Sequence, residues 1–247
     1  MCLIVVAWRT HPDFPLVVAA NRDEFYARPS APAAPWAEDP RVLGGRDLEA
    51  GGSWLAVRED GRFAAVTNVR EPGVPRAGRS RGLLVRDFLL GGQGAGPYAA
   101  GIPGGDYPGF NLLLGDGRSL WYRSNRDGAP RDLPAGVYGL ANQLLDTPWP
   151  KLLAAKARFS AALESLPDTG PLFELLADPE TVPDPLLPRT GLAPEWERML
   201  SAVFVRSDTY GTRASTVLGL GRDGGLRLEE RRFGAQGAWV GTIRFPH

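Results

Sequence analysis

Cysteine and histidine are almost absent from this 247-residue chain. Cys2 is the sole cysteine, and the histidines are His11 and His247. One cysteine excludes an internal disulfide framework and a CxxC metal motif, and a Cys/His zinc site would lack ligands. We therefore expect no metal site and no obligatory cofactor.

The chain also lacks long apolar runs and an excess of charge of either sign. No apolar run approaches the roughly 18 residues that span a bilayer, and the opening residues lack the basic and long apolar regions of a secretory signal. Lysine and arginine together number 28, as do aspartate and glutamate. A balanced charge gives no reason to expect a nucleic-acid partner. We expect a cytoplasmic protein with a small-molecule substrate, and the oligomeric state stays open.

Short apolar runs separated by turn signals predict a chain rich in strands. Three Asp-Gly turns, at 60–61, 116–117 and 223–224, predict hairpins. The expected strands are 2–8, 16–20, 54–58, 62–68, 110–115, 120–124, 137–141, 217–221, 226–233 and 239–245.

Helices are fewer, and the clearest is Pro150–Leu166, which opens on a proline and carries one apolar stripe. The other expected helices are 81–90, 172–177 and 195–204, and the expected loops are 28–40, 91–109 and 179–194.

Strands that come in hairpins predict mostly antiparallel sheets, and this much helix must cover sheet faces. Two fold solutions follow from the residues: two sheets between helical layers, or an open α+β sandwich with one sheet. The length suits a single domain over residues 1–247.

Cys2 is the first candidate for chemistry. Removal of Met1 would leave a thiol and a free α-amine on one residue, and an α-amine has a pKa of about 7.7–8.0. A nucleophile and its base would then share a residue. Alternatively, Cys2 is a small buried residue that starts a strand.

The tetrad Asn21-Arg22-Asp23-Glu24 follows the second apolar run. If the first two strands form a hairpin, the tetrad lies beside Cys2. Asp23 or Glu24 could then hold the α-ammonium group, and Arg22 could lower the pKa of the thiol. Alternatively, the four polar residues form an exposed turn.

Two asparagines and two arginines complete the candidates. Asn68 and Asn142 each end an apolar stretch, so each is a turn residue or an oxyanion donor. Arg206 and Arg213 flank a turn, where each is solvated or faces an anion. The arginine-rich stretch 70–86 is a solvated loop or a gate that attracts a carboxylate or phosphate.

Short blocks along nearly the whole chain resemble those of a known family. They are 1–2, 19–26, 51–55, 67–71, 80–82, 111–113, 139–142, 146–151 and 210–216. Together with the central Asn-Arg-Asp-Glu tetrad, the blocks resemble the NRDE family, whose eukaryotic members are the transport and Golgi organisation protein 2 group.

That family is distantly similar to the choloylglycine hydrolase and penicillin V acylase group, which are N-terminal-cysteine hydrolases of linear amides. The resemblance implies a four-layer αββα sandwich of the N-terminal-nucleophile hydrolase type, with Cys2 as nucleophile. It implies an active-site role for Asn68, an oxyanion role for Asn142, and a late active-site arginine at Arg206 or Arg213. It does not assign individual roles within the tetrad.

The resemblance also implies an alternative, because eukaryotic members have been linked to secretory organisation and to haem or lipid handling. The chain would then be a carrier on the same scaffold, or an interaction protein with a vestigial site. The available axial haem ligands are few: Cys2, His11, Met199 and His247.

Overall fold

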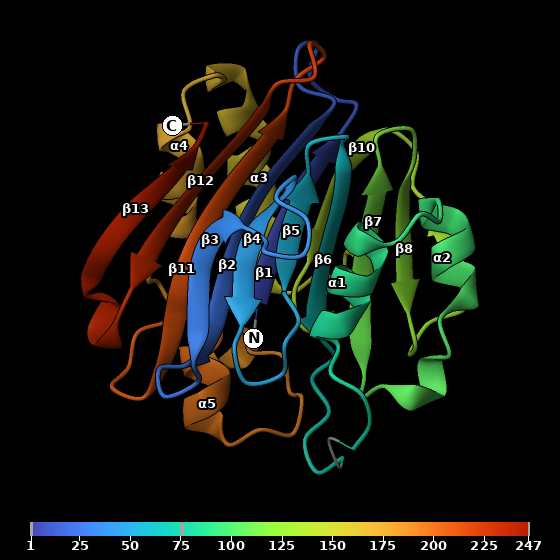
Figure 1. Ribbon diagram of the computed structural model, residues 1–247. Coiled ribbons are helices and arrows are strands. Elements are labelled where there is room, and N and C mark those ends of the chain that lie inside the picture. The colour runs from blue at the N-terminus through green and yellow to red at the C-terminus, as the bar shows by residue number, and fades with distance from the viewer. Residues whose placement is uncertain (1, 75–76, 247) are drawn as a thin grey trace.

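Two antiparallel β-sheets lie face to face in the protein. A computed structural model describes residues 2–74 and 77–246 (Figure 1). The first sheet has the strand order β10-β1-β2-β11-β12-β13, and the second has the order β3-β4-β5-β6-β7-β8-β9. None of the helices in these ranges is long and apolar enough to cross a membrane.

Most strands pair with their neighbours in sequence through short connections. The first sheet consists of β1 (Cys2–Trp8), β2 (Leu16–Phe25), β10 (Gly136–Leu140), β11 (Tyr210–Leu220), β12 (Leu226–Phe233) and β13 (Trp239–Phe245). The second consists of β3 (Ser30–Pro35), β4 (Val42–Asp47), β5 (Leu55–Arg58), β6 (Arg62–Asn68), β7 (Phe110–Asp116), β8 (Leu120–Ser124) and β9 (Arg131–Asp132).

Helices cover the outer face of each sheet (Figure 1). The first sheet carries α3 (Pro150–Ala162) and α4 (Gly170–Leu176), and the second carries α1 (Gly82–Leu90) and α2 (Ala95–Gly101). A short helix, α5 (Pro194–Met199), lies near the end of the sandwich where β1 begins. The layers are therefore helix, sheet, sheet and helix, which confirms the four-layer prediction over the one-sheet alternative.

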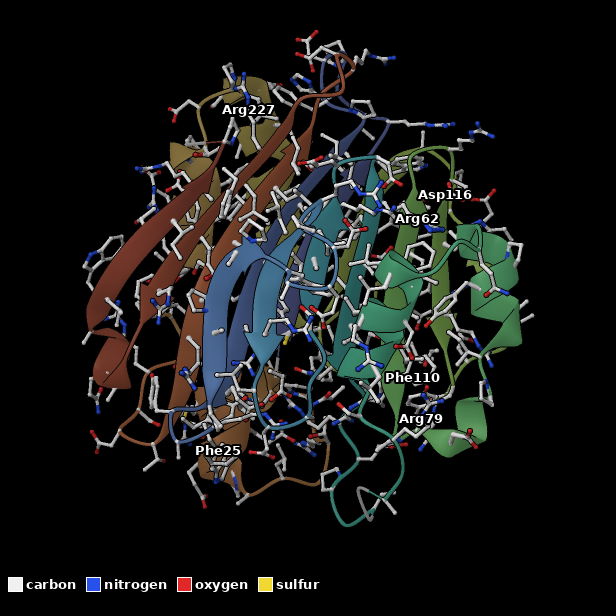
Figure 2. All side chains as sticks on the ribbon, in the orientation of Figure 1. Phe25, Arg62, Arg79, Phe110, Asp116 and Arg227 are labelled. Atoms are coloured by element: carbon white, nitrogen blue, oxygen red, sulfur yellow. The ribbon has the colours of Figure 1, made fainter. Side chains whose placement is uncertain are left out.

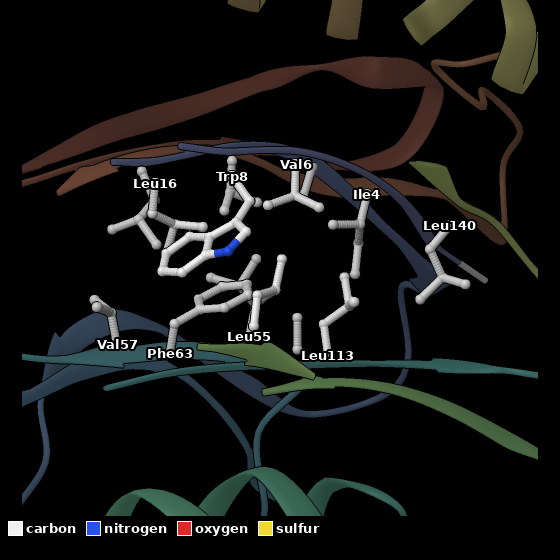
Figure 3. Close-up of a cluster of buried hydrophobic side chains, with 14 of the residues drawn as sticks. Ile4, Val6, Trp8, Leu16, Leu55, Val57, Phe63, Leu113 and Leu140 are labelled. Atoms are coloured by element: carbon white, nitrogen blue, oxygen red, sulfur yellow. The ribbon is translucent and has the colours of Figure 1, made fainter. Parts of the chain in front are cut away.

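The alternation of side chains along β1 decides which way Cys2 faces. Ile4, Val6 and Trp8 point between the sheets, where they meet side chains such as Phe63 and Leu113 (Figure 3). The intervening residues of β1 pack against α3 and α4. Because β1 is buried on both faces, its sequence is a continuous apolar run. Cys2 shares the parity of Ile4, so it lies on the face between the sheets.

The second strand is longer than predicted. It pairs with β11 as far as Phe25, which is opposite Tyr210. The polar tetrad therefore lies within β2 and does not follow it. The turn alternative for the tetrad is thus wrong, because a partner strand distant in sequence continues the hydrogen-bond ladder.

Other differences lie at the edge of the second sheet and in its helical cover. The predicted loop 28–40 contains β3, which is an edge strand and so tolerates its prolines. β4 was not predicted, and the predicted connector 91–109 contains α2. The predicted helix 195–204 ends earlier, at Met199, and the last turn of 150–166 is a 3₁₀ helix.

Candidate active site

Cys2 lies on the wall of a cavity of about 480 Å³ at the end of the sandwich where β1 begins. As the first residue of β1, it is directly opposite Arg22 on β2. Directly opposed residues in an antiparallel pair have neighbouring side chains. Cys2 is a free, buried thiol, and Arg22, Asp23 and Glu24 also line the cavity. Phe25 and Arg79, which line it as well, lie at this same end of the molecule (Figure 2).

The environment of Cys2 keeps the thiol protonated. Burial raises the pKa of the Cys2 thiol, the carboxylates of Asp23 and Glu24 raise it further, and Arg22 opposes them. Attack by the sulfur therefore needs a group that takes the proton.

Asn21 faces away from Cys2, across the sheet. Its Nδ2 donates to the carbonyls of Leu176 (2.8 Å) and Val203 (2.9 Å), and its Oδ1 accepts from Ser215 Oγ (2.6 Å). These partners belong to the helical layer and to the outward face of β11. Because side chains alternate along a strand, Asn21 and Arg22 cannot both face Cys2. The structure brings Arg22 to the thiol and uses Asn21 to attach the helical layer.

Asp23 and Glu24 both reach the cavity wall, but their surroundings differ. Asp23 is buried, and its Oδ1 accepts from Thr212 Oγ1 at 2.7 Å. Burial raises the pKa of Asp23, and the nearby Lys151 and Thr212 lower it. Glu24 is half-buried, and its carboxylate lies 4.0 Å from Arg22 and 3.9 Å from Arg28.

Lys151 is a functional candidate that the sequence reasoning did not select. Its Nζ is buried and donates to the carbonyl of Leu200 at 2.7 Å. Burial lowers its pKa to about 8, and the neighbouring Asp23 and Cys2 act in the opposite direction. In the sequence, the only features that could have singled out Lys151 were the scarcity of lysine and its position within the block 146–151.

Asn68 and Asn142 are linked to each other at the same end of the sandwich. Asn142 Nδ2 donates to the Asn68 carbonyl at 3.0 Å. β10 pairs with β1 up to Leu140 opposite Ile4, and the same register, extended by two residues, places Asn142 opposite Cys2. Asn68 lines the cavity, whereas Asn142 is fully buried, and its Oδ1 has no hydrogen-bond partner among the described residues.

The two late arginines occupy different places. Arg213 lines the cavity, and its Nη1 donates to the carbonyls of Phe25 (3.0 Å) and Arg28 (2.7 Å). Burial lowers its pKa. Arg206 is exposed and stacks on the ring of Phe204, with 5.2 Å between the guanidinium carbon and the ring centroid. Of the two alternatives, the structure brings Arg213 to the cavity.

The arginine-rich stretch 70–86 divides between cavity and framework. Arg79 and Arg81 line the cavity. Arg70 is buried and forms a 3.0 Å ion pair with Glu197. Arg76 lies outside the described residues. Only part of the stretch can therefore contact a ligand.

One strand near the edge of the first sheet, β12, supplies two charged cavity residues that the sequence did not suggest. Arg232 and Glu230 lie on β12 and line the cavity. The sequence did not distinguish them because residues 229–232 are four consecutive charged residues, which is typical of an exposed strand.

The four candidate haem ligands are not gathered at one place. His11 lies beyond the far end of β1 from Cys2, and its Nδ1 accepts from the backbone N–H groups of Asp13 and Phe14. Met199 packs with an apolar cluster around Leu200, and His247 lies outside the described residues. In the described parts of the chain, no three His, Cys, Asp or Glu side chains are grouped to hold a metal ion.

The chain is similar to known proteins along nearly its whole length. The family model described as Transport and Golgi organisation 2 matches residues 1–235. The Transport and Golgi organization protein 2 homolog of Bos taurus is 38% identical, with 94% of this chain and 92% of the relative covered. The Homo sapiens homolog is 37% identical with the same coverage, and the Drosophila melanogaster protein is 29% identical over 88% of this chain and 87% of its own.

The fold also occurs among solved structures. One of them is the Caenorhabditis elegans N-acylethanolamine-hydrolyzing acid amidase ortholog, with a TM-score of 0.53 and 14% sequence identity. The match covers 88% of this chain and 92% of the amidase. The likeness shows an N-terminal-nucleophile hydrolase fold.

Proposed function

This chain belongs to the Transport and Golgi organisation 2 family, and from that premise we propose that it hydrolyses a linear amide or related acyl substrate with Cys2 as nucleophile. The observation that carries the proposal is the position of Cys2. It is the first residue of a central strand, and it opens onto a polar cavity directly beside Arg22. The neighbour of the same fold is, by its name, an amide hydrolase.

The reaction needs the α-amine that removal of Met1 would expose on Cys2; Met1 itself lies outside the described residues. The amine takes the thiol proton, and the sulfur attacks the carbonyl carbon. The amine half of the substrate leaves with a proton from the α-ammonium group, and a thioester remains. Water, deprotonated by the amine, then attacks the thioester; the carbon–sulfur bond breaks, the acid is released, and the Cys2 sulfur takes the proton back from the α-ammonium group. The proposed reaction steps do not use a cofactor.

Asn68 is the better candidate for an amide that contacts the substrate. It lines the cavity, whereas Asn142 is buried and donates to the Asn68 carbonyl. We therefore assign the oxyanion contact to Asn68 with a backbone N–H, and assign Asn142 to positioning. Removal of one oxyanion donor costs about 10²–10³ in kcat. The α-amine of processed Cys2 would also be a suitable donor to Asn142 Oδ1, which has no hydrogen-bond partner within residues 2–74 and 77–246.

The test combines intact mass with covalent labelling. Protein from its source organism should have lost Met1, and an electrophilic acyl probe should add one acyl group to the wild type. Because Cys2 is the only cysteine, Cys2→Ala is a clean control and should not be labelled. Retention of Met1 would remove the base, and equal labelling of Cys2→Ala would exclude the thiol as nucleophile.

A further inference from the structure

A row of four residues crosses the floor of the cavity and ends on an arginine. Cys2 is opposite Arg22, Arg22 is opposite Ala214, and Ala214 is opposite Arg232. Neighbouring strands are about 4.7–4.9 Å apart, so the backbones of Cys2 and Arg232 are separated by about 14 Å. Ala214 has only a methyl side chain, which leaves space in the middle of the row.

Most cavity arginines are already engaged within the protein. Arg28 pairs with Asp47 and Glu49, both at 2.8 Å, and Arg46 pairs with Glu38 at 2.9 Å. Arg213 donates to backbone carbonyls. Carboxylates therefore balance the charges of Arg28 and Arg46, and backbone oxygens hold the guanidinium of Arg213 in the wall.

Arg232 and Glu230 differ from the other charged residues of the cavity. Within residues 2–74 and 77–246, the Arg232 guanidinium has no hydrogen-bond partner and no carboxylate oxygen within 4.0 Å. Glu230 is 4% exposed, and among the described residues only one of its carboxylate oxygens accepts a hydrogen bond, from the Ala33 N–H at 2.9 Å. Its neighbour across the strands, Thr216, has a buried Oγ1 without a partner in the same part of the chain.

These groups recognise opposite charges. The guanidinium of Arg232 suits a carboxylate. The free oxygen of Glu230 and the hydroxyl of Thr216 suit an ammonium group, since both can accept a hydrogen bond. Burial raises the pKa of Glu230, while the Ala33 N–H and Arg232 lower it, so an arriving cation would favour its ionised form.

We propose that the cavity takes amides whose acyl half ends in an α-amino acid group, with the α-carboxylate at Arg232 and the α-ammonium at Glu230. The scissile carbonyl then lies at Cys2, joined to the α-carbon by a few methylene groups that cross Ala214. This inference rests on the proposed hydrolase function and specifies its substrate class.

A second cavity offers a place for the amine half of the substrate. It has a volume of about 310 Å³ and shares Glu24, Phe25 and Asn68 with the first. Its wall includes Trp196 and Tyr210, whose rings meet edge to face with 5.5 Å between centroids. An aromatic or apolar amine fits such a wall.

The test uses three p-nitroanilides that differ only in the acyl half: γ-L-glutamyl, glutaryl and pentanoyl. The γ-glutamyl compound has both charged groups, the glutaryl compound only the carboxylate, and the pentanoyl compound neither. We expect kcat/KM to fall at least tenfold with each charged group that the substrate lacks, because the protein group that would pair with it is then left unpaired. Arg232→Gln should abolish the preference for the glutaryl over the pentanoyl anilide. Glu230→Gln should abolish the preference for the γ-glutamyl over the glutaryl anilide.

Arg227→Gln is the matched control, because Arg227 is on the same strand but lies at the opposite end of the molecule from Phe25 and Arg79 (Figure 2). It should keep the wild-type preferences. Equal hydrolysis of all three anilides would overturn the substrate class and leave the hydrolase function intact.

A binding measurement separates the two proposals. Cys2→Ala should bind the γ-glutamyl anilide at least tenfold more tightly than the pentanoyl anilide in calorimetry. If it does so while the wild type hydrolyses none of the three, the hydrolase function fails and the recognition site stands. If Cys2→Ala shows no such preference, the recognition site fails.

Discussion

Replacement of Asn21 by leucine should lower the stability of the folded protein and leave the Cys2 thiol in place. The Asn21 side chain is fully buried and holds three parts of the chain together. Its amide N–H groups are the donors to the carbonyls of Leu176, at the end of α4, and Val203. Leucine has a similar volume and no polar atom, so the change removes hydrogen bonds with little change in packing.

The magnitude follows from the groups left behind. Each of the two buried carbonyls loses its Asn21 donor, and an unsatisfied buried polar group costs about 1–3 kcal/mol. We expect Asn21→Leu to lower the free energy of unfolding by about 3 kcal/mol. Ser215→Ala leaves only Asn21 Oδ1 without its donor, so about 1 kcal/mol is expected. The double variant should resemble Asn21→Leu, because both changes break the same contact.

Urea unfolding of the wild type, the two single variants and the double variant measures these differences. Labelling by the acyl probe measures the reactivity of Cys2 in the folded fraction. Folded Asn21→Leu should label like the wild type. A variant as stable as the wild type that no longer labels would show that Asn21 acts in the chemistry, and the structural role assigned here would be wrong.

Two further predictions concern a buried charge and a close backbone contact. Lys151 has a folded-state pKa of about 8, below its unfolded value of about 10.4. Between these pH values the folded protein binds fewer protons than the unfolded chain. The contribution of Lys151 to the free energy of unfolding therefore rises with pH across this window. The wild-type free energy of unfolding minus that of Lys151→Met should grow by about 3 kcal/mol from pH 7 to pH 10.5, and a constant difference in urea titrations would contradict the shift. A Cβ on Gly52 would lie 2.3 Å from the carbonyl carbon of Gly82, so Gly52→Ala should cost about 1–3 kcal/mol by overpacking. The control Gly92→Ala, with no atom within 4 Å of its new Cβ, should leave the thermal midpoint nearly unchanged, and equal midpoints for both variants would refute the close contact.

The contact between Gly52 and Gly82 also explains two of the sequence blocks. Blocks 51–55 and 80–82 meet where the backbone N–H of Ser53 donates to the Gly82 carbonyl at 3.1 Å. The glycines are needed there because two backbones approach too closely for side chains. Residues of these blocks, including Ser53 and Arg81, line the cavity, so the contact shapes the site wall.

Local sequence was sufficient to predict many of the strands and the place of Cys2 at the start of one of them. The apolar run Cys2–Trp8 is a central strand buried on both faces, and the Asp-Gly pairs occur at hairpins. These features depend on residues close together in the chain, so their patterns survive in a single sequence. The start of α3 at Pro150 was predicted for the same reason.

Tertiary structure alone decided which candidates share the cavity. Asn21 and Arg22 are adjacent in sequence, yet the strand pleat and the covering helices send them to opposite faces of the sheet. Arg213 reaches the cavity and Arg206 does not, because β11 pairs with β2 across nearly 190 residues of chain. Arg232 and Glu230 join them only through the register of β12 with β11. Such long-range pairing is set by the burial of whole sheet faces, which no local pattern encodes.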